Sequence, residues 1–190
     1  MNLLLSGITG LIGSNFYRYS AGKFNKIIGL SRSKYNSVTH IKIDLTEEFS
    51  IELPDSDIVL HTAAQTSANT AKKKPLYDLN LNAGGLVRII ENYRKQKLSP
   101  FIVFIGNATQ VGMTTSIVNE KNRKCDKPIT FYDLSKNTAE NYLMMYVQHK
   151  IVTGCSLRLC NVYGARGGLQ NSDRGILDKM MEKALNRESL

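Results

Sequence analysis

The stretch that decides the fold is Ser6-Gly7-Ile8-Thr9-Gly10-Leu11-Ile12-Gly13, which joins a short apolar run to a segment with helical spacing. Glycine permits a tight turn from a strand into a helix, and it lets the backbone approach a bound pyrophosphate closely. The unpaired N–H groups at the start of the helix can then bind the anion. Glycines at this spacing and in this context favour a dinucleotide-binding turn over a turn that only joins two elements.

Outward from this turn, short apolar runs alternate with longer segments of helical periodicity. The predicted strands are Asn2–Leu5, Lys26–Leu30, His40–Ile43, Ile58–His61, Phe101–Ile105 and Val152–Leu159. The predicted helices are Leu11–Ser20, Leu76–Lys95, Phe131–His149 and Asp173–Arg187. This alternation predicts an α/β fold, a doubly wound parallel sheet with helices on both faces. With the glycine turn after the first strand, the expected order is the Rossmann-like 3-2-1-4-5-6, with the ligand at the carboxyl ends of the strands.

Composition narrows the class of protein. The chain has 190 residues, enough for one good-sized domain, and the charged fraction of 22% beside 42% hydrophobic residues argues against disorder. No apolar run approaches the ~20 residues of a membrane helix. The run Leu3-Leu4-Leu5 is too short for a signal peptide and lacks a basic segment before it. We therefore expect a cytoplasmic protein with no membrane partner.

The net charge of +9 suits a cofactor and a substrate that both carry phosphates. No basic motif interleaved with aromatic residues is present, so nucleic acid is not an expected partner. The run Lys72-Lys73-Lys74 is predicted to be a solvated loop.

The cysteines are Cys125, Cys155 and Cys160, an odd number without metal-ligand spacing. Neither a disulfide nor a metal site is expected. Cys155 and Cys160 lie in the apolar stretch Thr153–Val162, where they are expected to pack as small core residues.

The sequence Tyr132-Asp133-Leu134-Ser135-Lys136 places a phenol and an ammonium on one face of a predicted helix, one turn apart. A tyrosine with a pKa of ~10 is a poor base at neutral pH, but a neighbouring ammonium favours its phenolate. Tyr132 could then exchange a proton with a substrate hydroxyl or carbonyl. Thr130 and Asp133 form a weak capping box at the start of this helix. Ala139, Leu143, Met144 and Val147 share its apolar face.

The end of the second strand bears on the choice of cofactor. An acidic residue there would bind the ribose 2′-hydroxyl of NAD, whereas this chain has Leu30-Ser31-Arg32-Ser33-Lys34. Arg32 can bind a 2′-phosphate, with Ser31 or Ser33 adding hydroxyl donors. NADP is therefore favoured and NAD remains possible. The alternative is that Arg32 only stacks on adenine or faces water.

Several further motifs stand in a fixed order after the glycine turn. They are Asp44-Leu45, His61-Thr62-Ala63-Ala64, Pro75 followed by Asn82, and Arg158-Leu159-Cys160-Asn161-Val162-Tyr163-Gly164. With the spacing of Gly7, Gly10 and Gly13, they make the chain resemble the extended short-chain dehydrogenase/reductases, the NAD-dependent epimerase/dehydratase family that modifies nucleotide-sugars. The resemblance runs from Met1 to about Leu190.

The resemblance implies roles for individual residues. Tyr132 would be the acid/base, and Lys136 would tune it and hold the nicotinamide ribose. Asn161 would contact the nucleotide-sugar, whereas Arg158 would order the surrounding loops. The cofactor contacts implied by the residues and the resemblance together are Gly7, Gly10, Leu11, Ile12, Gly13, Ser31, Arg32, Asp44, Leu45, Ala63, Ala64, Asn82, Tyr132 and Lys136.

The chain departs from the family pattern after the fifth strand. Asn107 stands where the family has a serine or threonine, and an amide can donate a hydrogen bond but cannot relay a proton as a hydroxyl does. Thr109, two residues on, could substitute. Ala108 and Thr109 replace the Asp–Glu pair of the family's sugar dehydratases, which disfavours water elimination and leaves epimerisation or ketone reduction.

We therefore expect residues 1–165 to form the NAD(P)-binding domain and residues 166–190 to begin a truncated substrate-binding lobe. The expected function is that of an NAD(P)-dependent nucleotide-sugar epimerase or ketoreductase, with hydride transfer at a sugar carbon. The alternative is a non-catalytic dinucleotide-binding or sensor protein, which Asn107 and the short C-terminal part favour. By resemblance, a homodimer could form through the helices after the fourth and fifth strands.

Overall fold

The computed structural model describes residues 1–36, 38–112, 117, 119–121, 127–164 and 176–189. The strands are β1 (Asn2–Ser6), β2 (Lys26–Ser31), β3 (Thr39–Lys42), β4 (Ile58–His61), β5 (Phe101–Asn107) and β6 (Thr153–Leu159). The α-helices are α1 (Leu11–Ser20), α2 (Ala68–Lys73), α3 (Pro75–Leu79), α4 (Gly85–Lys95), α5 (Phe131–Gln148) and α6 (Ile176–Leu185). A π-helical segment, η1, spans Asn80–Gly84, and a 3₁₀ turn, η2, spans Ala108–Val111. In the described residues, no helix is long and apolar enough to cross a membrane.

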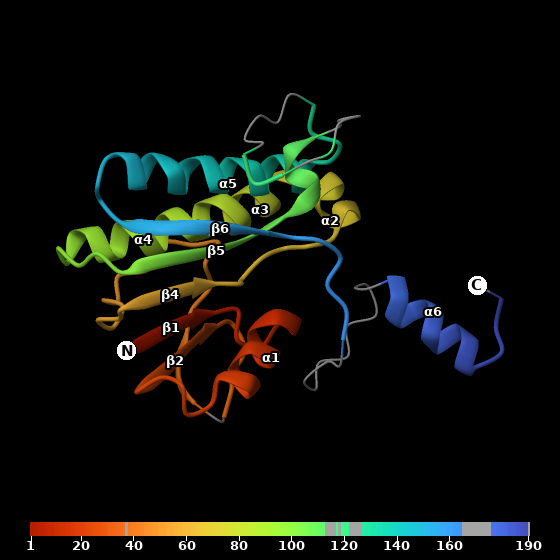
Figure 1. Ribbon diagram of the computed structural model, residues 1–190, viewed down its shortest axis with the longest axis horizontal. Coiled ribbons are helices and arrows are strands. Elements are labelled where there is room, and N and C mark those ends of the chain that lie inside the picture. The colour runs from red at the N-terminus through yellow and green to blue at the C-terminus, as the bar shows by residue number, and fades with distance from the viewer. Residues whose placement is uncertain (37, 113–116, 118, 122–126, 165–175, 190) are drawn as a thin grey trace.

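The strands form one parallel sheet in the order β3-β2-β1-β4-β5-β6, which confirms the predicted topology. Helices α3, α4 and α5 cover one face and α1 covers the other, as Figure 1 shows. Chain order reverses beside β1, which pairs with β2 on one side and with β4 on the other. In open sheets of this kind, ligands bind at the carboxyl ends of the strands next to such a reversal.

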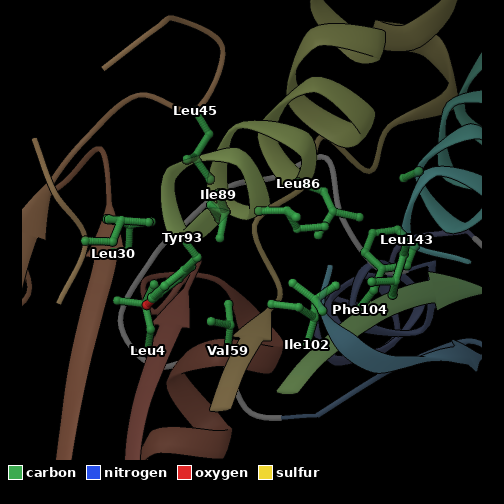
Figure 2. Close-up of a cluster of buried hydrophobic side chains, with 14 of the residues drawn as sticks. Leu4, Leu30, Leu45, Val59, Leu86, Ile89, Tyr93, Ile102, Phe104 and Leu143 are labelled. Carbon is green, nitrogen blue, oxygen red and sulfur yellow. The ribbon is translucent and has the colours of Figure 1, made fainter. Parts of the chain in front are cut away.

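The two faces of the sheet carry separate apolar clusters. Leu4, Val59, Ile102 and Phe104 face α4 and α5 and pack with side chains of those helices, including Leu86, Ile89, Tyr93 and Leu143 (Figure 2). Leu3, Leu5 and Leu60 face the opposite way and pack with Ile8 towards α1. Because both faces of the central strands are covered, these strands are apolar at almost every position.

The strand β6 is less buried than the sequence suggested. It pairs with β5 alone among the described strands, and its residues are intermediate or exposed. Cys155 is accordingly only half-buried, and Cys160, just beyond the strand, is exposed. The prediction that both pack in the core was wrong because it took the apolar run for a central strand. Cys125 lies outside the described residues.

The predicted helix Leu76–Lys95 is present but not uniform. Proline starts α3 at its first position, as the missing N–H of proline allows. The helix then continues as the wider π-helical turn η1, and α4 follows it to Lys95. Two short elements, α2 and η2, were not predicted. Lys72 and Lys73 are exposed as expected, but they lie in the last turn of α2 and not in a loop.

The helix α5 confirms the predicted cap and the predicted apolar face. The Thr130 hydroxyl accepts a hydrogen bond from Asp133 N, and the Asp133 carboxylate accepts one from Thr130 N. Ala139 and Leu143 are fully buried, with Met144 and Val147 packed beside them.

Near the C-terminus, the described part of the predicted helix Asp173–Arg187 is α6, which lies apart from the sheet (Figure 1). Residues 165–175 lie outside the description, and so does most of the predicted boundary at Gly164–Gly168.

Candidate functional site

The glycine turn is held between β1 and α1 by short backbone hydrogen bonds. Gly7 has a φ of +73°, a conformation that only glycine adopts without strain. Its N–H donates to the Leu30 carbonyl at 2.7 Å, which ties the turn to β2. Gly10 N donates to the Gly7 carbonyl at 2.8 Å, which closes the turn just before the helix.

The turn is also packed too closely for side chains. A Cβ atom on Gly7 would lie 2.6 Å from the Ala63 amide nitrogen, and one on Gly13 would overlap the Gly7 carbonyl. In the described part of the chain, no side chain caps the first turn of α1 at Gly10. The first amides of α1 have no partner within the helix, so they form a cradle that fits a pyrophosphate.

The turn after β4 is bonded to the end of β1. Thr62 Oγ1 donates to the Ser6 carbonyl at 2.6 Å, and Ala63 N donates to Ser6 Oγ at 3.3 Å. Ala63 and Ala64 are half-buried beside the glycine turn. The predicted cofactor contacts of β1, α1 and the β4 turn are therefore brought together at one edge of the sheet.

His61 is buried beneath this edge. Its Nδ1 lies 2.8 Å from Ser6 Oγ, and its ring stacks on Phe104 with centroids 6.1 Å apart. Its Nε2 is buried without a hydrogen-bond partner among the described residues. Burial, reinforced by the charge of Lys136, lowers the pKa of His61 to about 3. The ring is therefore neutral at physiological pH.

The predicted adenosine side of the site lies at the ends of β2 and β3. Arg32 is exposed, and its Nη1 donates to the Tyr77 hydroxyl of α3 at 3.1 Å. Ser31 Oγ donates to the Ser33 carbonyl at 2.8 Å. Asp44 Oδ1 accepts hydrogen bonds from Thr46 N and Thr46 Oγ1. These bonds fix the turn that contains buried Leu45.

Lys136 is a buried cation on α5. Its Nζ donates to the Ile105 carbonyl of β5 and lies 4.4 Å from the centroid of the Phe104 ring. Burial lowers the pKa of Lys136 to about 7, and the charge of Asp78 acts in the opposite direction. Half-buried Tyr132 precedes it by one helical turn, so phenol and ammonium share one face of α5 as predicted.

Asn107 and Thr109 meet at the start of α5, on the Asp133 carboxylate. Asn107 Nδ2 donates to Thr109 Oγ1 at 2.7 Å and to Asp133 Oδ1 at 3.0 Å. The Thr109 hydroxyl donates to the same Asp133 oxygen at 2.5 Å. Its proton is therefore engaged within the protein. The sequence pattern predicts Asp133 only as a helix cap, so this second role was not expected.

A buried polar cluster links the π segment to α5. Asn82 Oδ1 accepts from Gln65 N at 2.9 Å, and Asn82 Nδ2 lies 3.0 Å from both Asp78 Oδ1 and Ser135 Oγ. Asn82 is fully buried, so it could affect a cofactor only indirectly, through the turn at Gln65. Gln65, Asp78 and Ser135 were not among the predicted site residues. One signal was available, because Asp78 and Asn82 continue the apolar stripe of Leu86, Ile89 and Tyr93 at helical spacing.

Arg158 and Asn161 differ in their surroundings. Arg158 of β6 forms an ion pair with Glu140 of α5, and Glu140 also accepts from Gln110 Nε2 and Ser156 Oγ at 2.5 Å each. These bonds hold the pKa of Glu140 below its usual value although burial raises it. Arg158 therefore contacts helix α5 through Glu140, and its role in ordering the surrounding loops stays a prediction. Asn161 is exposed beyond β6.

Comparison with known proteins bears on the identity of this chain. One related sequence is UDP-glucuronate 4-epimerase 4 of Arabidopsis thaliana, 23% identical over 88% of this chain and 43% of its own length. Among solved structures, the UDP-glucose 4-epimerase of Thermotoga maritima with UDP-glucose has a TM-score of 0.87 at 22% identity. It is matched over 100% of this chain and 65% of its own.

A second solved structure is the UDP-glucose 4-epimerase of Thermus thermophilus in complex with NAD. It has a TM-score of 0.82 at 22% identity, over 100% of this chain and 64% of its own. The chain thus spans less than two thirds of the length of each of these relatives. Residues 3–190 match the sequence profile of the NAD dependent epimerase/dehydratase family. With the glycine turn and the Tyr132–Lys136 helix in place, the chain belongs to this family.

Proposed function

We propose that this chain forms the dinucleotide-binding part of an NAD(P)-dependent nucleotide-sugar epimerase or ketoreductase in which Tyr132 is the acid/base. The observation that carries the proposal is the common location of two features. The glycine cradle lies at the carboxyl end of β1, and Lys136 is bonded to Ile105 near the carboxyl end of β5 in the same parallel sheet. A cofactor bound along this edge would reach from one feature to the other.

The chain's own residues would perform the binding and the proton transfer. Amides of Leu11, Ile12 and Gly13 would hold the pyrophosphate of the cofactor. A bound nicotinamide supplies the hydride acceptor or donor for chemistry at a sugar carbon. Tyr132 would take a proton from the substrate hydroxyl or return it, and the Lys136 ammonium favours the phenolate form that this exchange requires. Asn161 would contact the nucleotide-sugar.

The contacts of Asn107 bear on which reaction we propose. Its amide and the Thr109 hydroxyl both donate to Asp133, so Asp133 would orient the two groups beside the substrate oxygen. Ala108 and Thr109 occupy the place of the acid and base of a dehydratase, so epimerisation or ketone reduction is the proposed outcome. The same contacts favour the second candidate, a non-catalytic dinucleotide sensor, because the Thr109 proton is already engaged.

Replacement of Tyr132 by phenylalanine distinguishes the two candidates. We expect Tyr132→Phe to abolish epimerisation or reduction of nucleotide-sugars in the protein at its natural length, while cofactor still binds. The matched control is Tyr19→Phe, which removes a phenol from an exposed position of α1 and should leave turnover unchanged. Cofactor binding without redox change in the wild type would identify a sensor. Near-normal turnover of Tyr132→Phe would remove the acid/base assignment.

We propose NADP as the preferred cofactor, with NAD as the alternative. Support comes from the absence of an acidic residue at the end of β2 and from exposed Arg32, whose contact with Tyr77 of α3 holds it beside the end of that strand. Fluorescence titration should show tighter binding of NADPH than of NADH, by about tenfold. Arg32→Ala should abolish the difference without weakening NADH. Equal affinities in the wild type would contradict the assignment.

We also propose a homodimer formed through α5. Phe131, Leu134, Tyr142 and Met145 recur along one face of this helix and are all exposed. An apolar stripe of this kind on a surface helix is typical of a protein interface. Sedimentation equilibrium of the wild type and of Met145→Asp measures the state directly, and a monomeric wild type would contradict the proposal.

A further inference from the structure

Asp78 is a carboxylate in an unusual place. It lies on α3 with 1% of its surface exposed. Its Oδ1 accepts from Gln65 Nε2 at 2.7 Å and from Asn82 Nδ2 at 3.0 Å. Its Oδ2 is buried and has no hydrogen-bond partner among the described residues. A carboxylate in such surroundings is costly unless a positive charge lies nearby.

Lys136 presents the complementary problem. Its ammonium is buried, and the contacts that it makes are with the Ile105 carbonyl and the face of the Phe104 ring. Both stabilise a cation, but neither carries a full negative charge. The two buried charges come from adjoining parts of the structure, because Asn82 bonds to Asp78 on one side and to Ser135 on the other, and Lys136 follows Ser135 in α5.

Apart from Tyr132, which lies one turn earlier on the same face of α5, the other titratable groups around Lys136 have different partners or no charge. His61 of β4 stacks on the same Phe104 ring and is neutral. The remaining buried carboxylates of the described residues are Asp133 and Glu140, both on α5. Asp133 accepts from Thr130 and Thr109, and Glu140 is paired with Arg158. Asp78 is thus the buried carboxylate left to balance the ammonium, and its charge raises the pKa of Lys136 against the effect of burial.

We propose that Asp78 is the counter-charge of Lys136, a positioning residue that keeps the ammonium charged inside the site. The proposal rests on the proposed function only in that Lys136 is there to assist Tyr132. Without the carboxylate, Lys136 would lose its proton at lower pH, and a neutral amine does not favour a phenolate. Asp78 would thereby set the pH range in which Tyr132 can act, without touching the substrate.

The direct test is the titration of Lys136 itself. The chain is labelled with ε-¹³C lysine, the Lys136 signal is assigned with Lys136→Met, and its midpoint is followed by NMR against pH in the absence of cofactor. Asp78→Asn keeps the shape of the side chain and should lower the midpoint by about one pH unit or more. The matched control is Asp57→Asn, an exposed carboxylate at the opposite end of the sheet that bonds to Asn2 N. It should leave the midpoint in place. An unchanged midpoint in folded Asp78→Asn would overturn the proposal.

A stability cycle covers the case in which Asp78→Asn is poorly folded. Melting temperatures are compared for the wild type, Asp78→Asn, Lys136→Met and the double variant slightly below neutral pH. Each single change leaves one buried charge without its counter-charge, so the double variant should melt higher than the sum of the two losses predicts. Strictly additive losses would assign Asp78 a packing role alone and overturn the proposal. Because neither measurement uses substrate or cofactor, both are independent of whether the Tyr132→Phe experiment succeeds.

Discussion

The two halves of the candidate site are built by opposite means. The glycine turn depends on the absence of side chains, since a Cβ atom on Gly7 or Gly13 would meet neighbouring backbone. The half formed by α5 depends on ionisable side chains held away from water, such as Lys136, Asp133 and Glu140. The first half is therefore fixed by steric fit, and the second by electrostatics. Variants of the two halves should respond differently to pH.

The largest effect is expected in the glycine turn. Gly7→Ala places a methyl group against the Ala63 backbone at a positive φ, and we expect a loss of more than about 3 kcal/mol of stability together with loss of cofactor binding. The matched control is Gly22→Ala, where φ is +79° but no atom lies within 4 Å of the added Cβ. The control should lose only about 1 kcal/mol, the cost of the backbone conformation. Urea unfolding at two pH values measures both. Equal losses would show that close packing does not define the turn.

A smaller effect, of about 3 kcal/mol, is expected when the ion pair on α5 is broken. Glu140→Gln leaves the Arg158 guanidinium, whose side chain is 15% exposed, without its counter-charge. The matched control is Glu48→Gln, the same change in the pair with Arg88, where the Glu48 side chain is 85% exposed. The control should change stability by less than about 1 kcal/mol. Similar losses in the two variants would mean that burial of the pair is unimportant.

The smallest effect concerns His61 and depends on pH. The pKa of this ring is about 3 in the folded chain against 6.5 for a free histidine, so the unfolded chain binds more protons between these values. Stability should therefore rise with pH across this window, and the contribution is lost as the pH falls towards 3. His61→Phe should remove part of the slope, at most about 1.4 kcal/mol per pH unit, whereas exposed His149→Phe should not. Chemical unfolding at several acidic pH values measures the slope, and an identical slope in both variants would contradict a buried neutral ring.

The sequence predicted the elements whose periodicity is strong. The bounds of α1 and the apolar face of α5 follow from local patterns, whereas the strand order was expected from the fold that the glycine turn indicates. The exposure of Cys160 did not follow from a local pattern, because a run of apolar residues cannot tell a central strand from one at the edge of the sheet. The spacing of Asp78 from Leu86 indicates the buried side of the helix, but it does not predict the hydrogen bond of Asp78 with Gln65, 13 residues away. Such facts depend on contacts between distant segments, and local sequence carries little trace of them.

The roles predicted for site residues had the same limit. The spacing of Tyr132 and Lys136 gave their shared helix face, since that is a property of one helix. It could not show that Asn107 and Thr109 both bond to Asp133, because these bonds span 26 and 24 residues of chain. Nor could sequence spacing show that Asn82 bonds to Ser135, 53 residues away.

The wide turn η1 has a consequence for how this region could change by insertion or deletion. A π turn amounts to one residue added within an α-helix, and each helical residue advances by about 100°. Removing a single residue from Asn80–Gly84 would restore regular α-helical pairing through to α4. Because the wider turn absorbs the extra residue, removing it would change the phase of α3 against α4 little, so Asp78 and Leu86 would keep their places. One codon lost here, provided that it is not the Asn82 codon, should therefore spare both the packing of α4 and the polar cluster beneath it.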